Sequence, residues 1–540
     1  MGVRSVPRGR SGHRLRGARY RSGTVQRACL AGVVLALAGC EVGPDFSTPN
    51  SQVADKWLES GDHRVKHPGR DDTTWWKALN DPILDALVAT AYRQNLTLQT
   101  AGVHVLEARA QLGAAIGELY PQQQAASGSL QRQRSPFLAG IPSAQPWFTS
   151  ASIGLSTSWE IDLWGKFRRA IQSADANLLA SVASYDDVLV SLIADVASTY
   201  VTIRTTEEQL RITRQNIVLQ EESLKIAHSR FVNGETSQRD EEQAQSELSD
   251  TEAQLPQLET SLQQSKNALA ILLGIPPQRL GTALGTGGAI PTAPLEVAIG
   301  IPADLLRRRP DIRQAEQVAA TQSALIGVDQ AELYPAFSFT GQFGLTSSNV
   351  GQAHLSDVFN WGNRVISFGP AVQWNILNYG QITNKVRAQD AVFQQAILSY
   401  QNTVLRAQKE VEDALIAYLN AQLVTASLTT AVAAAQRSAE LALIQYREGQ
   451  TDYTTVLTAQ QTLLSQEDQL ATAQGSIPQG LIALYRAFGG GWTLRLGHEL
   501  ISPEIREAMA RRTNWGGLLQ PGAEQPPPSV QKYSIGLPEW

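Results

Sequence analysis

Two long segments without a single glycine or proline constrain the fold of this 540-residue chain most strongly. One lies between Gly165 and Gly234 and the other between Gly380 and Gly449, so the two segments are equal in length. Because Gly and Pro are the residues least favoured inside helices, both segments are predicted to be helical, over about 166–233 and 381–448. At 1.5 Å per residue each helix would reach roughly 100 Å, and a single globular domain cannot contain such rods.

The two segments belong to an internal repeat. Three markers recur at a common offset of 215: Trp159 as Trp374, Gly165 as Gly380, and Gly234 as Gly449. The tripeptide Leu119–Tyr120–Pro121 recurs as Leu333–Tyr334–Pro335, at an offset of 214. Fixed offsets of this kind indicate two copies of one structural unit. We assign residues 81–280 and 302–492 to the two copies, with a linker over 281–301.

Apolar residues along the long segments recur at steps of three and four. From Leu178 to Ile203 the mean step is about 3.6 residues, and the same steps recur from Phe393 to Tyr418. A continuous stripe of this period predicts coiled-coil-like packing between helices. We interpret these residues as core, so they bind no cofactor. After each Gly turn a returning helix is predicted, over 235–273 with an interruption at Pro256, and from 450 to about 473. A further helix precedes the strands of each copy, at about 82–119 and 303–333.

Strand patterns precede each long helix. From Ala151 to Leu163 apolar and polar residues alternate, and the same period of two recurs from Ile366 to Ile376. Phe337 to Leu345 gives a third strand, while about 122–132 is weakly patterned, so β-hairpins are expected at about 121–164 and 336–378. Such strands suit a membrane β-barrel or a half-buried soluble sheet. In lipid, four strands cannot close a barrel, so two, three or four chains would have to share eight, twelve or sixteen strands.

The N-terminus has the features of an export signal. A basic region is followed by the uncharged stretch 28–39, which is too short to span a bilayer and leads into Leu37–Ala38–Gly39–Cys40. This tetrapeptide has the form of a lipobox, so residues 1–39 are predicted to be a lipoprotein signal peptide and Cys40 to carry covalent lipid. The alternative is a signal anchor with an incidental cysteine. Residues 40–80 would be the anchor segment and 493–540 a C-terminal tail.

Charge and motifs argue against several functions. From Cys40 onward 37 basic residues stand against 50 acidic ones, and this net charge of −13 disfavours nucleic acid as a partner. The chain has no His-Glu-x-x-His, Gly-x-Ser-x-Gly or Cys-x-x-Cys motif. His63 and His67 lack neighbouring cysteines, and Arg307 to Arg309 are interpreted as a solvated or ion-paired helix start with Pro310 near the first helical position. We therefore expect neither an enzyme nor a metal site.

Several motifs, taken in order, resemble the outer-membrane efflux proteins of tripartite pumps, the TolC-like channels, and within them the lipoprotein branch. The motifs are Leu-Ala-Gly-Cys40 with Val42-Gly-Pro-Asp-Phe46, Trp75-Trp76, Trp159-Glu-Ile-Asp-Leu-Trp-Gly165, Arg308-Arg-Pro-Asp-Ile312 and Ala487-Phe-Gly-Gly-Gly-Trp492. Each is weak alone, but together with the duplication they cover residues 40 to 492.

The resemblance implies a mainly α fold with a membrane β part. A homotrimer would form a long α-helical barrel and a 12-stranded transmembrane β-barrel, to which each chain gives four strands. The channel would lie in outer-membrane lipid, dock on a periplasmic membrane-fusion adaptor and an inner-membrane RND-type transporter, and conduct drugs or other small toxic compounds passively. It would need no cofactor besides the lipid on Cys40.

The family's periplasmic gate lies at the turns after the long helices. Where many relatives have a Leu-Asp-Ala-Gln segment, this chain has Leu457–Thr458–Ala459–Gln460, so an acidic ring is not expected at Thr458. The candidates for lining the constriction are Arg239, Asp240, Glu242, Asp452, Tyr453, Thr454, Thr458 and Gln461. Two alternative functions stay open at this point: an outer-membrane duct for type I secretion of polypeptides, and a periplasmic coiled-coil scaffold lipoprotein without a pore.

Overall fold

A computed structural model describes residues 2, 41–66, 73–134, 147–285, 287–298, 302–350 and 354–520. The predicted signal peptide, Cys40, His67 and positions 521–540 of the predicted tail therefore lie outside the described residues. Contacts divide the chain into two units. One contains the strands of both hairpins, with segments 123–168 and 331–376, and the other contains most of the helical residues.

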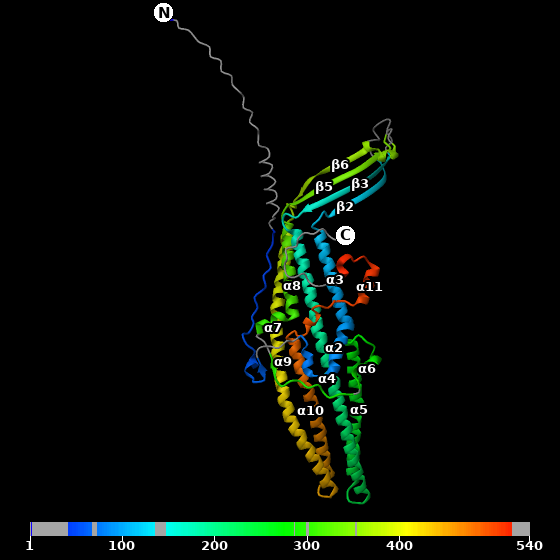
Figure 1. The fold of residues 1–540 in the computed structure, drawn as a ribbon, viewed down its shortest axis with the longest axis vertical. Coiled ribbons are helices and arrows are strands. Elements are labelled where there is room, and N and C mark those ends of the chain that lie inside the picture. The colour runs from blue at the N-terminus through cyan, green and yellow to red at the C-terminus, as the bar shows by residue number, and fades with distance from the viewer. Residues whose placement is uncertain are drawn as a thin grey trace. The chain divides into compact units, whose positions relative to one another are not determined.

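The first unit is one antiparallel sheet of four strands (Figure 1). Its order is β2 (Gln123–Arg134), β3 (Trp147–Ile161), β5 (Ala336–Ser348) and β6 (Arg364–Gln373). The two repeats meet where β3 pairs with β5. The weakly patterned segment is thus a strand, and β6 ends at Gln373, before the predicted Ile376. Just beyond this end, the Trp374 indole N–H donates to the Leu333 carbonyl at 3.0 Å. Two short 3-10 helices, η5 (Leu355–Phe359) and η6 (Trp361–Asn363), connect β5 to β6.

The register of the sheet separates an apolar face from a polar one. Gly128, Ile153, Leu345 and Arg364 form one row of directly paired residues, so their side chains point to the same face. On that face large apolar side chains are exposed, including Leu155 at 59% and Phe368 at 78%. The opposite face carries mostly Ser, Thr, Gln and Gly. The sheet therefore presents an uncovered apolar surface within its own unit.

The helical unit contains two hairpins of matching dimensions. The long helices α4 (Lys166–Val232) and α9 (Gln381–Arg447) have 67 residues each and agree closely with the predicted ends. The returning helices α5 (Gln238–Leu272) and α10 (Tyr453–Ala487) have 35 each. Two expectations were wrong: Pro256 does not interrupt α5, and α10 continues past Ala473 to Ala487.

Close packing explains why α10 continues through residues that usually end a helix. A Cβ atom on Gly475 would lie 2.3 Å from the Thr205 hydroxyl oxygen, and one on Gly480 would lie 2.9 Å from the Tyr418 Cα atom. These glycines therefore bring α10 against α4 and α9, and tertiary contacts compensate for their low helix propensity. Pro478, between them, is also buried.

The helices that precede the strands are each broken once. The predicted segment 82–119 forms α2 (Pro82–Gln94) and α3 (Leu96–Gly117), and the segment 303–333 forms α7 (Pro302–Arg308) and α8 (Pro310–Ala331). The break at Asn95 lies against the end of α5, since its amide donates to the Leu272 carbonyl at 2.9 Å. Likewise, Arg309 donates to the Ala487 carbonyl at the end of α10, at 2.7 Å. Consequently α3 continues the line of α5, and α8 that of α10.

The predicted apolar stripe is the core between these helices. Its most deeply buried members are Tyr185, Leu189, Val196, Tyr200 and Ile203 of α4, and Val404, Ala407, Val411, Leu415 and Tyr418 of α9. Each long helix contains an 18-residue window with a mean hydropathy of 1.3, and 61% of that window in α4 is buried. Burial in this seam accounts for the apolar character of the α4 window, whereas only 22% of the α9 window is buried. The buried residues of the stripe confirm the coiled-coil-like interpretation.

Smaller elements cover the middle of the helical unit. They are η1 (Leu58–Gly61), η2 (Trp75–Leu79), η4 (Pro277–Arg279), α6 (Leu280–Leu284), η7 (Trp492–Arg495), α11 (Pro503–Arg512), η8 (Gly516–Leu519) and the parallel pair β1 (Val65–Lys66) and β4 (Val297–Ala298). Part of the predicted C-terminal tail is thus folded: Met509 and Leu519 pack on Leu106 of α3. Arg495 lies 2.5 Å from the fully buried Asp186, which also pairs with Arg313 at 2.8 Å.

Candidate functional site

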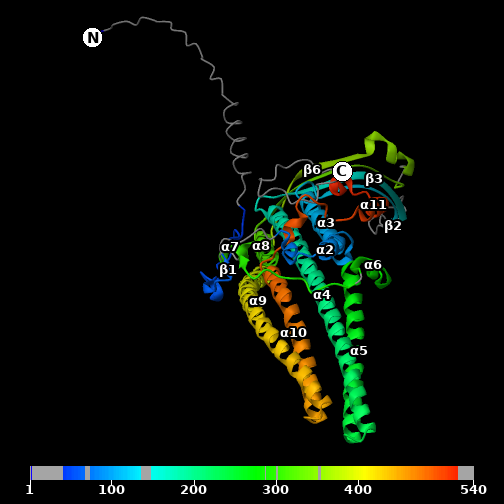
Figure 2. The same cartoon turned by 60° about the horizontal axis from the view of Figure 1, so that its bottom comes forward.

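The tips of the two helical hairpins end in turns of the same geometry (Figure 2). Gly234 and Gly449 adopt φ values of +73° and +76°, a conformation that glycine adopts without a steric penalty. The next residue closes each turn onto the long helix: the Glu235 N–H donates to Arg230 O at 2.9 Å, and the Gln450 N–H donates to Gln445 O at 2.8 Å. These bonds satisfy helix-end carbonyls and reverse the chain sharply.

A buried aromatic pair joins the tips. Tyr446 of α9 and Tyr453 of α10 are each 1% exposed, and their rings meet edge to face with centroids 5.3 Å apart. Ala227 of α4, Ala244 of α5 and Val456 of α10 complete the cluster, so all four helices contribute to it. Burial raises the pKa of both tyrosines, and the charge of Asp240 adds to the rise at Tyr446. Both phenols are therefore neutral at physiological pH.

Asp240 brings a carboxylate into this cluster. It lies in the first turn of α5, is 5% exposed, and accepts hydrogen bonds from the Thr236 hydroxyl at 2.5 Å and the Tyr446 hydroxyl at 3.3 Å. A negative charge in the first turn of a helix is favoured by the helix dipole. Asp240 thus connects the α4–α5 tip to α9 through a tyrosine hydroxyl.

Arg230 makes the second connection between the hairpins. It lies in the last turn of α4, and its guanidinium donates to the main-chain carbonyl of Tyr446. The same guanidinium lies 4.6 Å from the centre of the Tyr446 ring. Its Nε atom is 3.3 Å from Glu235, which belongs to the same hairpin as Arg230. A cation near the C-terminal end of α9 stabilises carbonyls that the helix itself leaves unpaired.

The structure separates the predicted constriction residues into buried and exposed groups. Asp240 and Tyr453 are buried in the cluster just described. The exposed residues are Arg239, Glu242, Asp452, Thr454, Thr458 and Gln461. Among these, Asp452, Thr454 and Thr458 line one open groove of about 480 Å³ between α9 and α10. Gln461 faces α5 instead, where its amide donates to Glu247 at 2.7 Å.

The groove between α9 and α10 is lined mainly by hydroxyl-bearing and alanine side chains and is weakly charged. The Thr458 hydroxyl donates to the Thr454 carbonyl at 2.9 Å, so it bonds along its own helix. Asp452 caps α10 by accepting from the Thr455 N–H at 3.1 Å. Asp452 is the only carboxylate among the described residues lining the groove.

Above the tips, α4 and α10 meet through buried amides. The Gln460 amide donates to the Ser223 hydroxyl at 2.6 Å, and the Asn216 amide donates to Glu467 at 2.7 Å. Gln220 is 1% exposed, and neither of its amide atoms has a hydrogen-bond partner among the described residues. Buried polar groups with incomplete bonding weaken an interface relative to an apolar one. This seam is therefore less costly to separate than the Tyr185–Tyr200 core.

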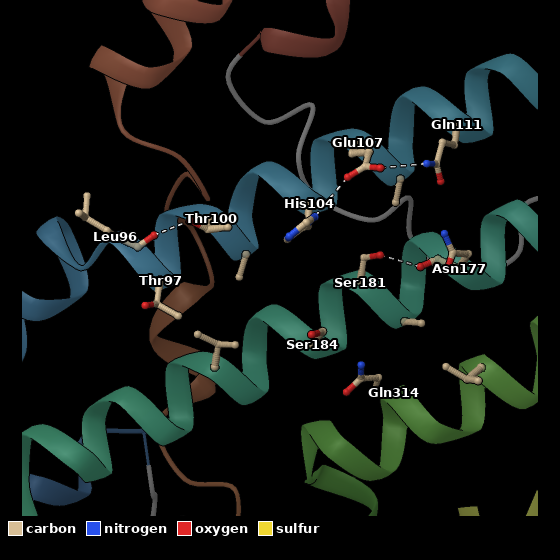
Figure 3. A pocket seen from close by; sticks show the side chains of 15 residues that line it. Leu96, Thr97, Thr100, His104, Glu107, Gln111, Asn177, Ser181, Ser184 and Gln314 are labelled. Atoms are coloured by element: carbon tan, nitrogen blue, oxygen red, sulfur yellow. Dashed lines mark hydrogen bonds and ion pairs between the residues drawn. The ribbon is translucent and has the colours of Figure 1, made fainter. Parts of the chain in front are cut away.

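A second hollow, of about 680 Å³, lies over α4 between α3 and α8 (Figure 3). Small and polar side chains line it, among them Thr97, His104, Asn177, Ser184 and Gln314. Glu107 is held between His104 at 3.2 Å and Gln111 at 3.2 Å, all on α3. In the described part of the chain no group of three or more His, Cys, Asp or Glu side chains is arranged to hold a metal.

Sequence reasoning missed Arg230 and Tyr446. Each differs from its counterpart in the other copy: at the common offset of 215, Arg230 corresponds to Gln445 and Tyr446 to Phe231. The hydroxyl gained at that position is the group that reaches Asp240. Differences between the two copies near the turns were thus the available signal.

Comparison with known proteins agrees with this architecture. The family model described as outer membrane efflux protein matches residues 87–275 and 301–490. The chain is 31% identical over 428 residues to the pyoverdine export outer membrane protein OpmQ of Pseudomonas putida, covering 78% of this chain and 88% of that protein. It is 28% identical over 464 residues to the probable outer membrane lipoprotein SilC of Salmonella typhimurium, covering 85% of this chain and 97% of that protein. The solved outer-membrane channel OprN aligns with a TM-score of 0.77 and 31% identity, over 84% of this chain and all of that one.

Proposed function

Because this chain belongs to the outer membrane efflux protein family, whose members are channels and not enzymes, we propose that it acts as a homotrimeric, lipid-anchored exit duct. The duct would receive drugs or other small toxic compounds from a periplasmic membrane-fusion adaptor and an inner-membrane RND-type transporter. The outer-membrane efflux channel itself follows from the family. The stoichiometry, the anchor, the partners and the cargo are the proposed parts.

The two open edges of the four-stranded sheet support assembly with further copies of the chain. Within the described residues, β2 and β6 each pair with one strand only, and the sheet has an uncovered apolar face. Unpaired backbone groups are not tolerated in hydrocarbon, so β2 of one copy would pair with β6 of the next. The strand directions allow this pairing, since an even number of antiparallel strands leaves the two edges antiparallel. Two, three or four copies would satisfy these edges, and three copies give the twelve strands that the family resemblance implies.

Native mass spectrometry of the detergent-solubilised protein tests the stoichiometry. We expect a complex of three chain masses, and stepwise conductance after reconstitution in planar bilayers. A complex of two or four chains would overturn the trimer without affecting the channel. Channel silence in a correctly assembled trimer would contradict the duct itself.

The lipid anchor rests on the lipobox and on the description of SilC as a probable lipoprotein. We expect the intact mass of the mature protein to begin at Cys40 and to include acyl chains. The variant Cys40→Ser should lack this added mass. An unmodified wild-type mass that begins at Met1 would contradict the anchor.

The helix tips would form the periplasmic gate. In this proposal Arg230 and the Asp240–Tyr446 pair hold the two hairpins of one chain together, while Asp452, Thr454 and Thr458 face the passage. Arg239, Glu242, Tyr453 and Gln461 would support the tips. Since the exposed side chains of the α9–α10 groove are mostly hydroxyls, this opening would select weakly by charge. Cargo of different charge could therefore pass, and selection would rest with the transporter.

A further inference from the structure

Charged side chains are rare in the four strands, and their positions are uneven. The described strands contain four of them: Arg132 and Arg134 on β2, Glu160 on β3 and Arg364 on β6. Arg132 pairs directly with Thr149, and Arg134 with Trp147. Both arginines therefore project from the same face as Ile153 and Leu155, which is the apolar face. Arg364 shares it through its row with Leu345 and Ile153. Glu160 lies on the polar face.

An arginine on a lipid-facing surface is tolerated only at certain depths. The cost is about 2 to 4 kcal/mol at the bilayer midplane and falls to about 0 to 1 kcal/mol near the interfaces. Arg132 and Arg134 end β2, and Arg364 begins β6, so all three stand at the loop end of their strands. This position is the one at which the cost of the charge is small.

Trp147 lies at the same level as these arginines, and Trp159 lies near the opposite end of β3. Trp147, opposite Arg134, is 52% exposed on the apolar face, and Trp159 is 39% exposed on that face of the same strand. The strand from Trp147 to Trp159 spans about 40 Å along its own axis, or about 30 Å along the membrane normal at a tilt of about 40°. That distance equals the thickness of the hydrocarbon core, so the two tryptophans would lie at its two interfaces.

Arg364 has its own interfacial aromatic residue. Its guanidinium lies 5.4 Å from the centre of the Trp361 ring and donates to the Trp361 carbonyl at 3.0 Å. Asp357, the nearest acidic residue in this connection, instead accepts from the His354 N–H at 2.9 Å and caps η5. No acidic side chain stands on the apolar face in the part of the strands that the structure describes. The rim of that face is therefore purely cationic.

From this arrangement we infer that Arg132, Arg134 and Arg364 bind the phosphate groups of lipid headgroups in the outer leaflet. The inference rests on the proposed placement of the strands in the outer membrane. Pairing of β2 with β6 of the next copy would bring the three arginines to one subunit boundary. Guanidinium groups bind phosphate oxygens in bidentate geometry, while the adjacent apolar face would contact the acyl chains. A lipid supplies both groups, whereas a free phosphate ion supplies only one.

The assembled protein in detergent at about 150 mM salt, close to physiological ionic strength, provides the test. Native mass spectrometry would measure the binding of lipid A with two phosphates, and of the same glycolipid after removal of its phosphates. Each arginine near a charged lipid surface contributes about 1 kcal/mol, or about fivefold in affinity. We expect Arg132→Gln/Arg134→Gln to weaken binding of phosphorylated lipid A roughly 30-fold, and Arg364→Gln about fivefold.

A matched control keeps the charge and the composition of β2. In the variant Gln131→Arg/Arg132→Gln/Gln133→Arg/Arg134→Gln the two arginines move to the polar face, and we expect it to lose binding like the double variant. Wild-type affinity in this control would overturn the inference, as would equal binding of the dephosphorylated glycolipid by the wild type. Displacement of the lipid by equimolar inorganic phosphate would assign the site to a free anion and also overturn it.

Conductance separates this inference from the proposed function. The double variant should conduct like the wild type, because its substitutions leave the polar face of the sheet unchanged. Loss of lipid binding with normal conductance supports the arginine site. A silent wild-type channel would contradict the duct, whatever its lipid binding.

Discussion

Replacing Arg230 by alanine should weaken the link between the two helical hairpins of each chain. The charge-assisted hydrogen bond to the Tyr446 carbonyl contributes about 1.5 to 3 kcal/mol, and the contact with the Tyr446 ring adds about 0.5 to 1 kcal/mol. The ion pair with Glu235 lies within one hairpin, so it does not count toward the link. The total is about 2 to 4 kcal/mol for each chain.

This magnitude corresponds to a large change in gating. If the tips open when the hairpins separate, a loss of about 2 to 4 kcal/mol shifts the equilibrium toward the open form by roughly 30- to 900-fold per chain. Single-channel recording in planar bilayers measures the fraction of time spent at high conductance. We expect that fraction to rise strongly in Arg230→Ala, while Arg230→Lys should show an intermediate rise because lysine keeps the charge without the planar guanidinium.

Arg447→Ala is the matched control. Arg447 ends α9 close to the same turn, is exposed, and lies 3.7 Å from its neighbour Glu448 on the same hairpin. We expect this variant to gate like the wild type. An unchanged open fraction in Arg230→Ala would refute the reasoning. An equal increase in Arg447→Ala would attribute the effect to loss of surface charge.

Three further predictions concern the helical unit. Gln220→Leu should raise the free energy of unfolding, measured by thermal denaturation, by about 1 to 3 kcal/mol, because it removes two polar atoms that have no hydrogen-bond partner among the described residues. A lower free energy of unfolding would contradict this. Burial, with Asp311 nearby, raises the pKa of Asp187 above its ordinary value of 3.8, so the folded state favours its protonated form. Asp187→Asn should therefore be more stable than wild type in neutral chemical unfolding, and this advantage should vanish as the pH falls below about 3.8. Thr458→Asp should make conductance at low salt sensitive to divalent cations, and an unchanged conductance would place residue 458 outside the passage.

The sequence predicted the long helices well because their signal is local. Long runs without Gly or Pro and an apolar stripe of period about 3.6 leave few alternatives to a helix. The predicted end of α10 was wrong because the signal that decides it is not local. Gly475 and Pro478 normally end a helix, but here they allow contact with Thr205 and with the helices beside α10. Only the partner surface reveals that a glycine serves packing.

The tip residues show a second limit. Their location near the turns could be predicted from the Gly positions, but the direction of each side chain could not. Asp240 and Tyr453 both resemble solvent-facing helix starts in the sequence, yet they are buried because the two hairpins pack at that level. Conversely, Thr458 remains exposed. A turn motif determines where a helix reverses, and the packing of a second hairpin determines which side chains it covers.

The two copies of the repeat build the same helix junction from different chemistry. In the first copy the Asn95 amide caps the Leu272 carbonyl, and Gly274 at φ +68° allows the chain to pass Gln94, whose carbonyl oxygen would lie 2.3 Å from an added Cβ. In the second copy Arg309 caps the Ala487 carbonyl, and Gly489 at φ +70° occupies the equivalent position just beyond the helix end.

Arg309 brings charges that Asn95 does not. Its guanidinium is buried and pairs with Asp311 at 2.8 Å and with Glu410 at 2.7 Å. Removing Arg309 would leave two carboxylates without their cation and the Ala487 carbonyl without a donor. Removing the Asn95 amide would leave only neutral groups unpaired, namely the Leu272 carbonyl and the Leu98 N–H. The second junction is therefore the more sensitive to substitution, although both align a returning helix with the helix that leads to the strands. The two copies therefore share the path of the backbone at this junction but differ in the capping side chain. In both copies the last carbonyl of the returning helix accepts a hydrogen bond from that side chain.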